Sequence, residues 1–302
     1  MNDRGVAAIV VLYHPDPLLL DRLLRSVMGQ VEKIFVIDNT PGSTADRSSF
    51  FDQYQGNISY LALGENKGIA TAQNVGIRKG TDAGYSHVLL LDQDSALPPG
   101  MVKKLLDAES KLILAGENIA AVGPLFVDEK TGNFSRAIRY SYLRIHKIAV
   151  DQSSWRPVET DYLIASGSLI RSVAFFDIGV MLEELFIDSV DIEWGLRAKN
   201  LGYKSYIIPS IRMMHSIGDG FVQFLGRKIN LHGDIRHYYL VRNAAYLLRI
   251  RHMGIEWRLV TLLKIPQYVL FYSFYSKNRL KSIKLLLAAI LDGMYGKLGR
   301  LE

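Results

Sequence analysis

Short apolar runs alternate with stretches of helical periodicity through the first third of the chain, and this alternation limits the available folds more than any other feature. The strand-like runs span 7–12, 33–37, 58–63 and 88–91, and the helix-like stretches span 18–28 and 69–79. Such alternation is typical of units in which helices cover the faces of a parallel sheet. We therefore predict an α/β fold with a Rossmann-like, mostly parallel sheet flanked by helices.

The pattern changes near residue 226. Before that point we expect further elements over 120–126, 160–171, 186–200 and 204–208, the last of them a strand that ends near Pro209. After it, the periodicity favours long amphipathic helices over 237–251 and 257–275, with a kink or break at Pro266. The 302 residues, 49% of them apolar, suffice for one large domain and an appendage. We place the domain at 1–225 and a helical extension at 226–302.

Composition excludes several classes of protein. The chain has no cysteine, which excludes disulfides, iron–sulfur clusters and cysteine-based zinc sites and is typical of a reducing compartment. Its first strand follows Met1 closely, and no signal-peptide cleavage site comes after it. No run reaches the roughly 18 apolar residues of a membrane-spanning helix. We expect a cytoplasmic protein that is not an integral membrane protein.

Positive charge is concentrated in the helical extension. Residues 226–302 contain fourteen Lys and Arg against four acids, whereas the other residues carry a net charge of −4. A basic, aromatic-rich region predicts an anionic partner, and amphipathic helices with cationic flanks suit a peripheral contact with a membrane surface, here the inner face of the plasma membrane. The alternative is a helical subdomain that packs on the body or on a second subunit of a homo-oligomer. Because the charge is confined to the extension, a nucleic-acid partner is disfavoured.

Two carboxylates, Asp92 and Asp94, follow directly after the apolar run 88–91. Ligands of open α/β sheets bind beyond the carboxyl ends of such strands. Two acids so close repel each other in a partly dehydrated site unless a cation or a shared proton lies between them, and oxygen ligands suit Mg²⁺ or Mn²⁺. We therefore predict a divalent metal that carries a phosphate. The alternative is a strand that ends in a solvated polar turn.

Two other strand ends also carry polar residues. The first strand ends in Tyr13 and His14, and the second ends in Asp38. A carboxylate at this edge can accept hydrogen bonds from a nucleobase or a ribose hydroxyl, although Asp38 could instead cap the following turn. The Gly-rich loop with Arg and Lys that a nucleotidyltransferase needs after its first strand is missing, which argues against that class.

A segment rich in small residues, 64–76, connects the third strand to a helix. Its small residues allow the helix to lie close to a strand or a ligand, and its N-terminal amides favour a negative group. The segment matches neither the phosphate-binding loop of kinases nor the dinucleotide fingerprint of dehydrogenases. Both of these classes are therefore disfavoured.

Three acids within six residues, Asp188, Asp191 and Glu193, are candidates for a general base. On a helix over 186–200, Asp188 and Asp191 would share a face, and burial beside other carboxylates would raise the pKa of the base toward neutrality. The alternative is an ordinary helix whose acidic first turn complements its dipole. His215, after the strand 204–208, could complete a metal site or contact a phosphate, or could simply be packed.

The order of these motifs resembles that of the inverting GT-A glycosyltransferases of family 2, over residues 5–220. The motifs are Tyr-His-Pro after the first strand, Asp-Asn after the second, Asn-Lys-Gly-Ile-Ala before a helix, Asp-Gln-Asp, an acidic cluster ending at Arg197, and a histidine. Within this family the chain looks most like bacterial rhamnosyltransferases that build cell-surface polysaccharides such as O-antigen, whose metal motif often reads Asp-Gln-Asp.

This resemblance implies a GT-A fold and the transfer of a sugar from a nucleotide-sugar donor to a glycan or lipid-linked glycan acceptor. The first candidate donor is dTDP-L-rhamnose, and another UDP- or dTDP-sugar is the alternative.

The resemblance also implies roles for particular residues. Asp92 and Asp94 would hold Mg²⁺ or Mn²⁺ on the donor diphosphate with His215 beside them, and Asp191 would be the catalytic base. The family commonly has Glu-Asp at the base, whereas Val190 precedes Asp191 here, so Asp188 is the alternative base. The implied donor-binding residues are Tyr13, His14, Asp38, Asn66, Gly68, Asn74, Asp92 and Gln93. The implied acceptor-side residues are Gly167, Ser168, Glu193 and Trp194.

Overall fold

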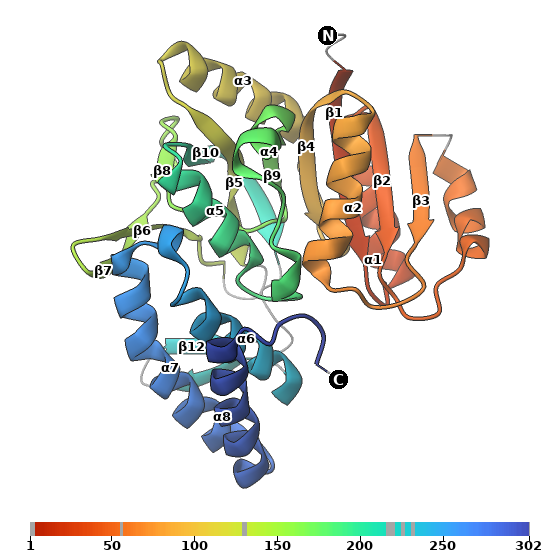
Figure 1. Ribbon diagram of the computed structural model, residues 1–302. Helices are drawn as coiled ribbons and strands as arrows, with labels where there is room; N and C mark the ends of the chain where they lie inside the picture. The colour runs from red at the N-terminus through yellow and green to blue at the C-terminus, as the bar shows by residue number, and fades with distance from the viewer. Residues whose placement is uncertain are drawn as a thin grey trace.

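An eight-stranded, mostly parallel sheet forms the centre of the molecule (Figure 1). The computed structural model describes residues 4–54, 57–128, 132–215, 221–224, 227–230 and 233–301. The strands, in spatial order, are β3 (Ile58–Ala62), β2 (Lys33–Asp38), β1 (Arg4–Leu12), β4 (Tyr85–Asp92), β9 (Ser168–Arg171), β5 (Ile119–Asp128), β10 (Lys204–His215) and β8 (Val158–Thr160). Strands β3, β2, β1 and β4 run parallel, as do β5 and β10, while β9 and β8 are antiparallel to their neighbours. The predicted α/β sheet is confirmed.

Helices cover both faces of this sheet. One face carries α1 (Pro17–Val27) and α3 (Met101–Leu114), and the other carries α2 (Ile69–Asp82), α4 (Ser172–Ile178) and α5 (Val190–Asn200). Along β1, Ala8 and Val10 belong to the buried cluster of α1 and α3, whereas Ala7 and Ile9 belong to that of α2, α4 and α5. Alternate side chains of one apolar strand therefore supply both cores, as a strand covered on both faces requires.

Local sequence explains where two of the helices begin. Asp16 caps α1 by accepting hydrogen bonds from the backbone N–H groups of Leu18 and Leu19, and Pro17 occupies the first helical position, where no N–H partner is needed. Asn278 caps the last helix in the same way, because its side-chain oxygen accepts from the Lys281 N–H at 3.1 Å.

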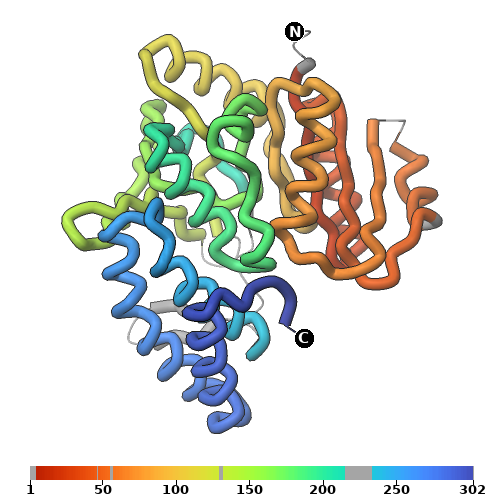
Figure 2. Tube along the Cα trace, viewed as in Figure 1, coloured from red at the N-terminus to blue at the C-terminus, as the bar shows by residue number. Residues whose placement is uncertain are grey.

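The C-terminal part of the chain forms a helical lobe below the sheet (Figure 2). It consists of α6 (Asp234–Leu247), α7 (Ile255–Tyr275) and α8 (Arg279–Tyr295). The remaining elements are the hairpins β6 (Arg136–Ser141) with β7 (Arg144–Ala149) and β11 (Phe221–Phe224) with β12 (Arg227–Asn230), and the short helices η1 (Ala45–Tyr54), η2 (Glu183–Leu185) and η3 (Arg251–Met253). The predicted boundary at 225/226 falls between the paired strands β11 and β12 and stays a prediction. No helix in the described ranges has both the length and the apolar character that a membrane crossing needs.

Three expected elements differ from the structure. The helix expected over 186–200 begins only at Val190, because Phe186, Asp188 and Ser189 have φ angles of 63–65° and cannot continue a right-handed helix. The strand expected to end near Pro209 continues to residue 215, since a register shift against β5 accommodates a residue that has no N–H to donate. Helix α7 is continuous through Pro266, so the break that was one of the two expectations is wrong, although proline lacks the hydrogen bond to the preceding turn; the alternative, a kink, stays a prediction.

The close packing of α2 on β1 generates a stability prediction. A Cβ added at Gly76 would lie 2.2 Å from Ile9 Cγ2, whereas one at Gly80 would be in ordinary contact at 3.4 Å. Gly76→Ala should therefore lower the free energy of unfolding by about 1–3 kcal/mol through overpacking. Gly80→Ala, on the same helix, should be neutral or stabilise by up to about 1 kcal/mol through helix propensity. Urea unfolding monitored by circular dichroism compares the two, and equal effects would contradict the prediction.

Candidate active site

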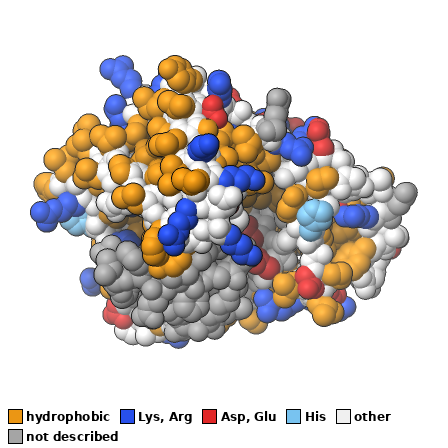
Figure 3. Space-filling model, turned by 90° about the horizontal axis from the view of Figure 1, so that it is seen from below, with side chains coloured by type: hydrophobic (Ala, Val, Ile, Leu, Met, Phe, Trp, Pro, Cys, Tyr) orange, Lys and Arg blue, Asp and Glu red, His pale blue; other side chains and the backbone are white. Residues whose placement is uncertain are grey.

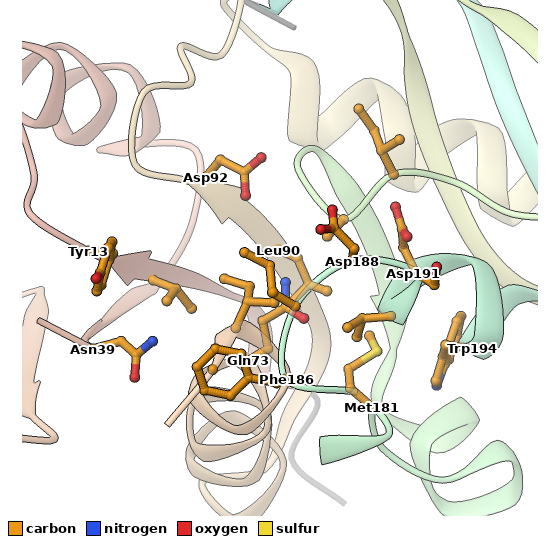
Figure 4. Close-up of a pocket in the computed structure, with 18 of the residues that line it drawn as sticks. Tyr13, Asn39, Gln73, Leu90, Asp92, Met181, Phe186, Asp188, Asp191 and Trp194 are labelled. Carbon is orange, nitrogen blue, oxygen red and sulfur yellow. The ribbon is translucent and has the colours of Figure 1, made fainter. Parts of the chain in front are cut away.

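A cavity of about 1060 Å³ opens at the carboxyl ends of β1, β2 and β4 (Figure 4). Tyr13 follows β1, Asn39 follows β2 and Asp92 ends β4, and all three line the cavity. On the opposite side the wall is formed by the segment 186–191, which carries Asp188 and Asp191. Open α/β sheets bind their ligands at such an edge.

Gln93 joins two of the strand ends. Its side-chain oxygen accepts from the Tyr13 N–H at 2.8 Å, and its amide nitrogen donates to the Tyr13 carbonyl at 3.1 Å. Both hydrogen-bonding groups of the amide are used on the backbone after β1. The middle residue of Asp-Gln-Asp therefore fixes the position of the neighbouring carboxylates relative to the end of the first strand.

Asp92 and Asp94 could hold a divalent metal ion. Both line the cavity, and the Asp92 N–H donates to Ser166 Oγ at 3.2 Å, which fixes the backbone at the strand end. Among the residues whose placement is described, no group of three or more His, Asp or Glu side chains is arranged around one metal position. The side chain of His215 lies outside the described set. The two carboxylates nonetheless fit Mg²⁺ or Mn²⁺, because these ions keep water or substrate phosphate oxygens as their other ligands.

Asp191 has the properties of a general base. It lies in the first turn of α5, faces the cavity, and accepts a hydrogen bond from the Ile192 N–H at 2.9 Å. Desolvation by the surrounding protein, reinforced by the charges of Asp188 and Asp92, raises the pKa of Asp191 to about 6. A carboxylate with a pKa in this range is ionised at neutral pH and still basic enough to accept a proton from a hydroxyl group.

Asp188 is engaged with a cation from the helical lobe. Arg236 at the start of α6 donates to both carboxylate oxygens of Asp188 at 3.2–3.3 Å. Arg236 and Arg300 also supply the cationic side chains among the described residues of the cavity wall, which otherwise carries the carboxylates Asp92, Asp94, Asp188 and Asp191. The C-terminal region thus provides the positive groups that an anionic ligand would meet in this acidic cavity.

The segment before α5 is held in place by two adjacent residues of α6. Asn243 donates from its side-chain nitrogen to the carbonyls of Leu185, Ile187 and Asp188 at 2.7–3.0 Å. Arg242, whose side chain is 1% exposed, donates to the Leu185 carbonyl at 2.9 Å and to a carbonyl of the C-terminal tail. These bonds supply side-chain donors to backbone carbonyl groups of the segment before α5, which buried carbonyl groups require.

The structure brings many of the predicted site residues together. The predicted residues that line the cavity are Tyr13, Asn66, Gly68, Asp92, Gln93, Asp94, Ser168, Asp188, Asp191 and Trp194. Those outside its lining are His14, Asp38, Asn74, Gly167 and Glu193.

Three of the residues outside the lining, Asp38, Asn74 and Glu193, form hydrogen bonds or ion pairs within the protein instead. Asp38 is buried and accepts hydrogen bonds from Tyr60 Oη at 2.8 Å and from Arg47 at 3.2 Å. Asn74 is fully buried and bonds through its side chain to the backbone of Met181 at 2.9 Å. Neither residue lines the cavity, and the donor-binding roles of Asp38 and Asn74 stay predictions.

Glu193 does not line the cavity either, and its acceptor-side role stays a prediction. Its buried carboxylate pairs with Arg197 at 2.9 Å and with His252 Nε2 at 2.7 Å. It therefore joins α5 to the segment before α7. Ser168 and Trp194 do line the cavity, but their polar side-chain atoms bond to backbone carbonyls, so they contribute shape and apolar surface to the wall.

Several cavity residues were not predicted from the sequence. Asn39 donates to the Asn66 side-chain oxygen at 2.9 Å and accepts from the Lys67 N–H at 2.8 Å. Because successive side chains of a strand point to opposite sides, its position next to Asp38 could have indicated it. Gln73 is 5% exposed, and its side-chain oxygen has no hydrogen-bond partner among the described residues. Such an acceptor on a cavity wall can be satisfied by a ligand hydroxyl or N–H.

Comparisons with known proteins identify the class of enzyme. The family model of glycosyl transferase family 2 matches residues 8–179. The structure of GalNAc-T7 with UDP, GalNAc and Mn²⁺ has the same fold, with a TM-score of 0.59 at 14% identity over 96% of this chain and 58% of that one. The chain therefore belongs to glycosyl transferase family 2 and is a glycosyltransferase with a GT-A fold.

Two sequence relatives match almost the full length. The dTDP-rhamnosyl transferase RfbF of Shigella flexneri is 33% identical over 98% of this chain and 97% of its own. The N-acetylglucosaminyl-diphospho-decaprenol L-rhamnosyltransferase of Mycobacterium tuberculosis is 27% identical over 92% of this chain and 96% of its own. The resemblance to rhamnosyltransferases within the family is thereby confirmed.

The contacts of Asn243 generate a prediction about the site. Asn243→Ala removes three hydrogen bonds to the segment 185–188 and should lower kcat/KM on the order of 10-fold to 100-fold by misplacing Asp188 and Asp191. Asn278→Ala, which removes the cap of α8 far from the cavity, should cost about 1 kcal/mol of stability and leave kcat/KM unchanged. Steady-state kinetics and thermal unfolding on both variants separate positioning from stability, and normal kinetics for Asn243→Ala would refute the proposed role.

Proposed function

We propose that this glycosyltransferase moves L-rhamnose from dTDP-L-rhamnose to a hydroxyl of a lipid-linked polysaccharide precursor, with inversion at the anomeric carbon. The names of the two long relatives support the donor and the type of acceptor. The cavity adds support, because apolar side chains such as Met181 and Phe186 lie among its polar groups and suit a 6-deoxy sugar with a methyl group. A family 2 enzyme that uses another UDP- or dTDP-sugar is the alternative.

The position of Asp191 across the cavity from Asp92 is the observation that carries the proposed mechanism (Figure 4). Asp191 takes the proton from the acceptor hydroxyl as its oxygen attacks the anomeric carbon. The bond between that carbon and the diphosphate oxygen breaks on the opposite face, and dTDP departs with the electron pair. A single displacement of this kind inverts the anomeric configuration.

The leaving diphosphate needs positive charge. Arg236 and Arg300 line the cavity and can neutralise part of the charge that develops on the phosphates. A Mg²⁺ or Mn²⁺ ion held by Asp92 and Asp94 would neutralise more of it when bound. The Mn²⁺ in the GalNAc-T7 structure supports a divalent metal for this chain. Asp188 restrains Arg236 at the cavity wall, so it is better suited to position a cation than to serve as the base.

A donor screen tests this function. With an acceptor that carries a lipid-linked amino sugar, the wild type should release dTDP from dTDP-L-rhamnose faster than it releases nucleotide from UDP-glucose or UDP-N-acetylglucosamine. Asp191→Asn should lower the rate by about 10²-fold to 10⁴-fold while leaving dTDP binding unchanged. Proton NMR of the product should show the inverted anomer. Near-normal turnover by Asp191→Asn would remove this residue as the base.

The pH dependence provides a second measurement on Asp191. The base must be ionised to act, and its pKa is raised to about 6. The rate should therefore be maximal above this pKa and fall as the pH decreases through it. The residual activity of Asp191→Asn should lack this acidic limb, and a wild-type profile that stays flat down to pH 5 would contradict the assignment.

The metal site leads to a separate prediction. Calorimetry should show that wild-type protein binds dTDP more tightly with Mn²⁺ than without it, and that Asp94→Ala loses most of this difference. Asp107→Ala serves as the matched control, because this carboxylate lies on the surface of α3 and pairs only with Lys103 among the described contacts. Equal metal dependence in wild type and Asp94→Ala would show that Asp94 does not bind the ion.

A further inference from the structure

Helices α7 and α8 each expose a row of apolar side chains to solvent. On α7 the row contains Leu259, Leu263, Leu270 and Phe274, and on α8 it contains Leu280, Leu287 and Leu291. The spacing of four or seven residues places each row on one side of its helix. We call these seven residues the apolar face.

The opposite sides of the two helices form the core of the lobe. Trp257, Ile265 and Tyr272 of α7 are buried, as are Leu286 and Ala289 of α8. A surface helix normally has one apolar side toward the core and one polar side toward water. Helices α7 and α8 are apolar on both sides, so packing among the described residues does not explain their solvent-exposed rows.

The charges along α7 and α8 are mostly positive, with Glu256 in the first turn of α7 and Asp292 near the end of α8 as the acids of these two helices. Residues 257–291 contain six Lys and Arg and no Asp or Glu. Lys277, Arg279, Lys281 and Lys284 are exposed at the turn between the helices and along the start of α8. Figure 3 looks at this end of the molecule and shows apolar side chains gathered together with Lys and Arg among them and at their edges.

We propose that the apolar face docks on an anionic lipid bilayer. Apolar side chains that enter the boundary between headgroups and acyl chains, with Lys and Arg beside them on anionic headgroups, form the usual interfacial contact of an amphipathic helix. A second copy of this chain is a poorer occupant, because an isologous pairing would bring together two surfaces on which six Lys and Arg outnumber the acids Glu256 and Asp292. This docking is a peripheral contact. It goes beyond the proposed function and does not depend on the sugar-transfer chemistry.

Helix α6 connects the two helices of the apolar face with the catalytic cavity. Helix α6 packs against both α7 and α8 and contributes Arg236 and Tyr239 to the cavity wall. One helix therefore contacts both the membrane-binding pair and the site. An acceptor carried on a lipid would be presented to the cavity from the surface on which α7 and α8 rest.

Vesicle sedimentation with the full-length chain tests the proposal. Wild-type protein should bind vesicles that contain phosphatidylglycerol and bind pure phosphatidylcholine vesicles much less, with binding weakened by added NaCl. A triple variant, Leu263→Gln, Leu270→Gln and Phe274→Ser, should lower the partition coefficient by about tenfold or more. A second variant with Lys277, Arg279, Lys281 and Lys284 all changed to Gln should lose the preference for anionic vesicles.

A matched control distinguishes this face from exposed apolar residues in general. Leu114→Gln, Phe176→Ser and Leu201→Gln change side chains that are similarly exposed on the α/β body and should leave vesicle binding unchanged. Release of dTDP with a water-soluble acceptor should be the same in all of these variants, so loss of catalysis and loss of docking are measured separately. Vesicle binding that is equal in the wild type and the triple variant would overturn the proposal. So would a wild-type dimer in light scattering that becomes a monomer in the triple variant without any vesicle binding.

Discussion

The hydrogen bonds between α6 and the backbone of residues 184–188 are the interaction on which the site depends. Two residues of this segment, Phe186 and Asp188, and the adjoining Ser189 have positive φ angles without being glycine, and each such residue costs of order 1–3 kcal/mol unless its surroundings fix it. Arg242 and Asn243 fix it by donating to its carbonyl groups, and Phe186 stacks on Tyr239 with ring centroids 4.9 Å apart. The helix that carries Asp191 begins directly after this segment, so its position follows from these contacts.

The sheet was predictable from the sequence because its signals are local. Each apolar run and each helix-like stretch carries its own periodicity, and the rule that parallel strands end at one edge then places Asp92 beside the ends of β1 and β2. The segment before α5 was not predictable in this way. Its conformation depends on donors that lie 55–58 residues further along the chain, and no local pattern in residues 186–189 records them.

The candidate site was predicted in part for a related reason. Spacing indicates which residues reach the edge of the sheet but not what else competes for their side chains. The Asp38 carboxylate is hydrogen-bonded to Tyr60 and Arg47. The Glu193 carboxylate pairs with Arg197 and His252. Asn39, the residue after Asp38, lines the cavity instead. Arg300 could not have been anticipated, because its place on the cavity wall depends on the return of the C-terminal tail to the body of the protein (Figure 2).

The placement of Phe186 has a consequence for how the chain folds. This side chain belongs to the α/β body by sequence, yet it is buried in the same cluster as Tyr239, Ile265 and Leu286 of the helical lobe. A core that includes residues from both regions is lost as a whole when either region unfolds. The body and the lobe should therefore melt in one cooperative transition. A chain truncated after the sheet would lose the residues that the lobe contributes to this core, together with the basic helices.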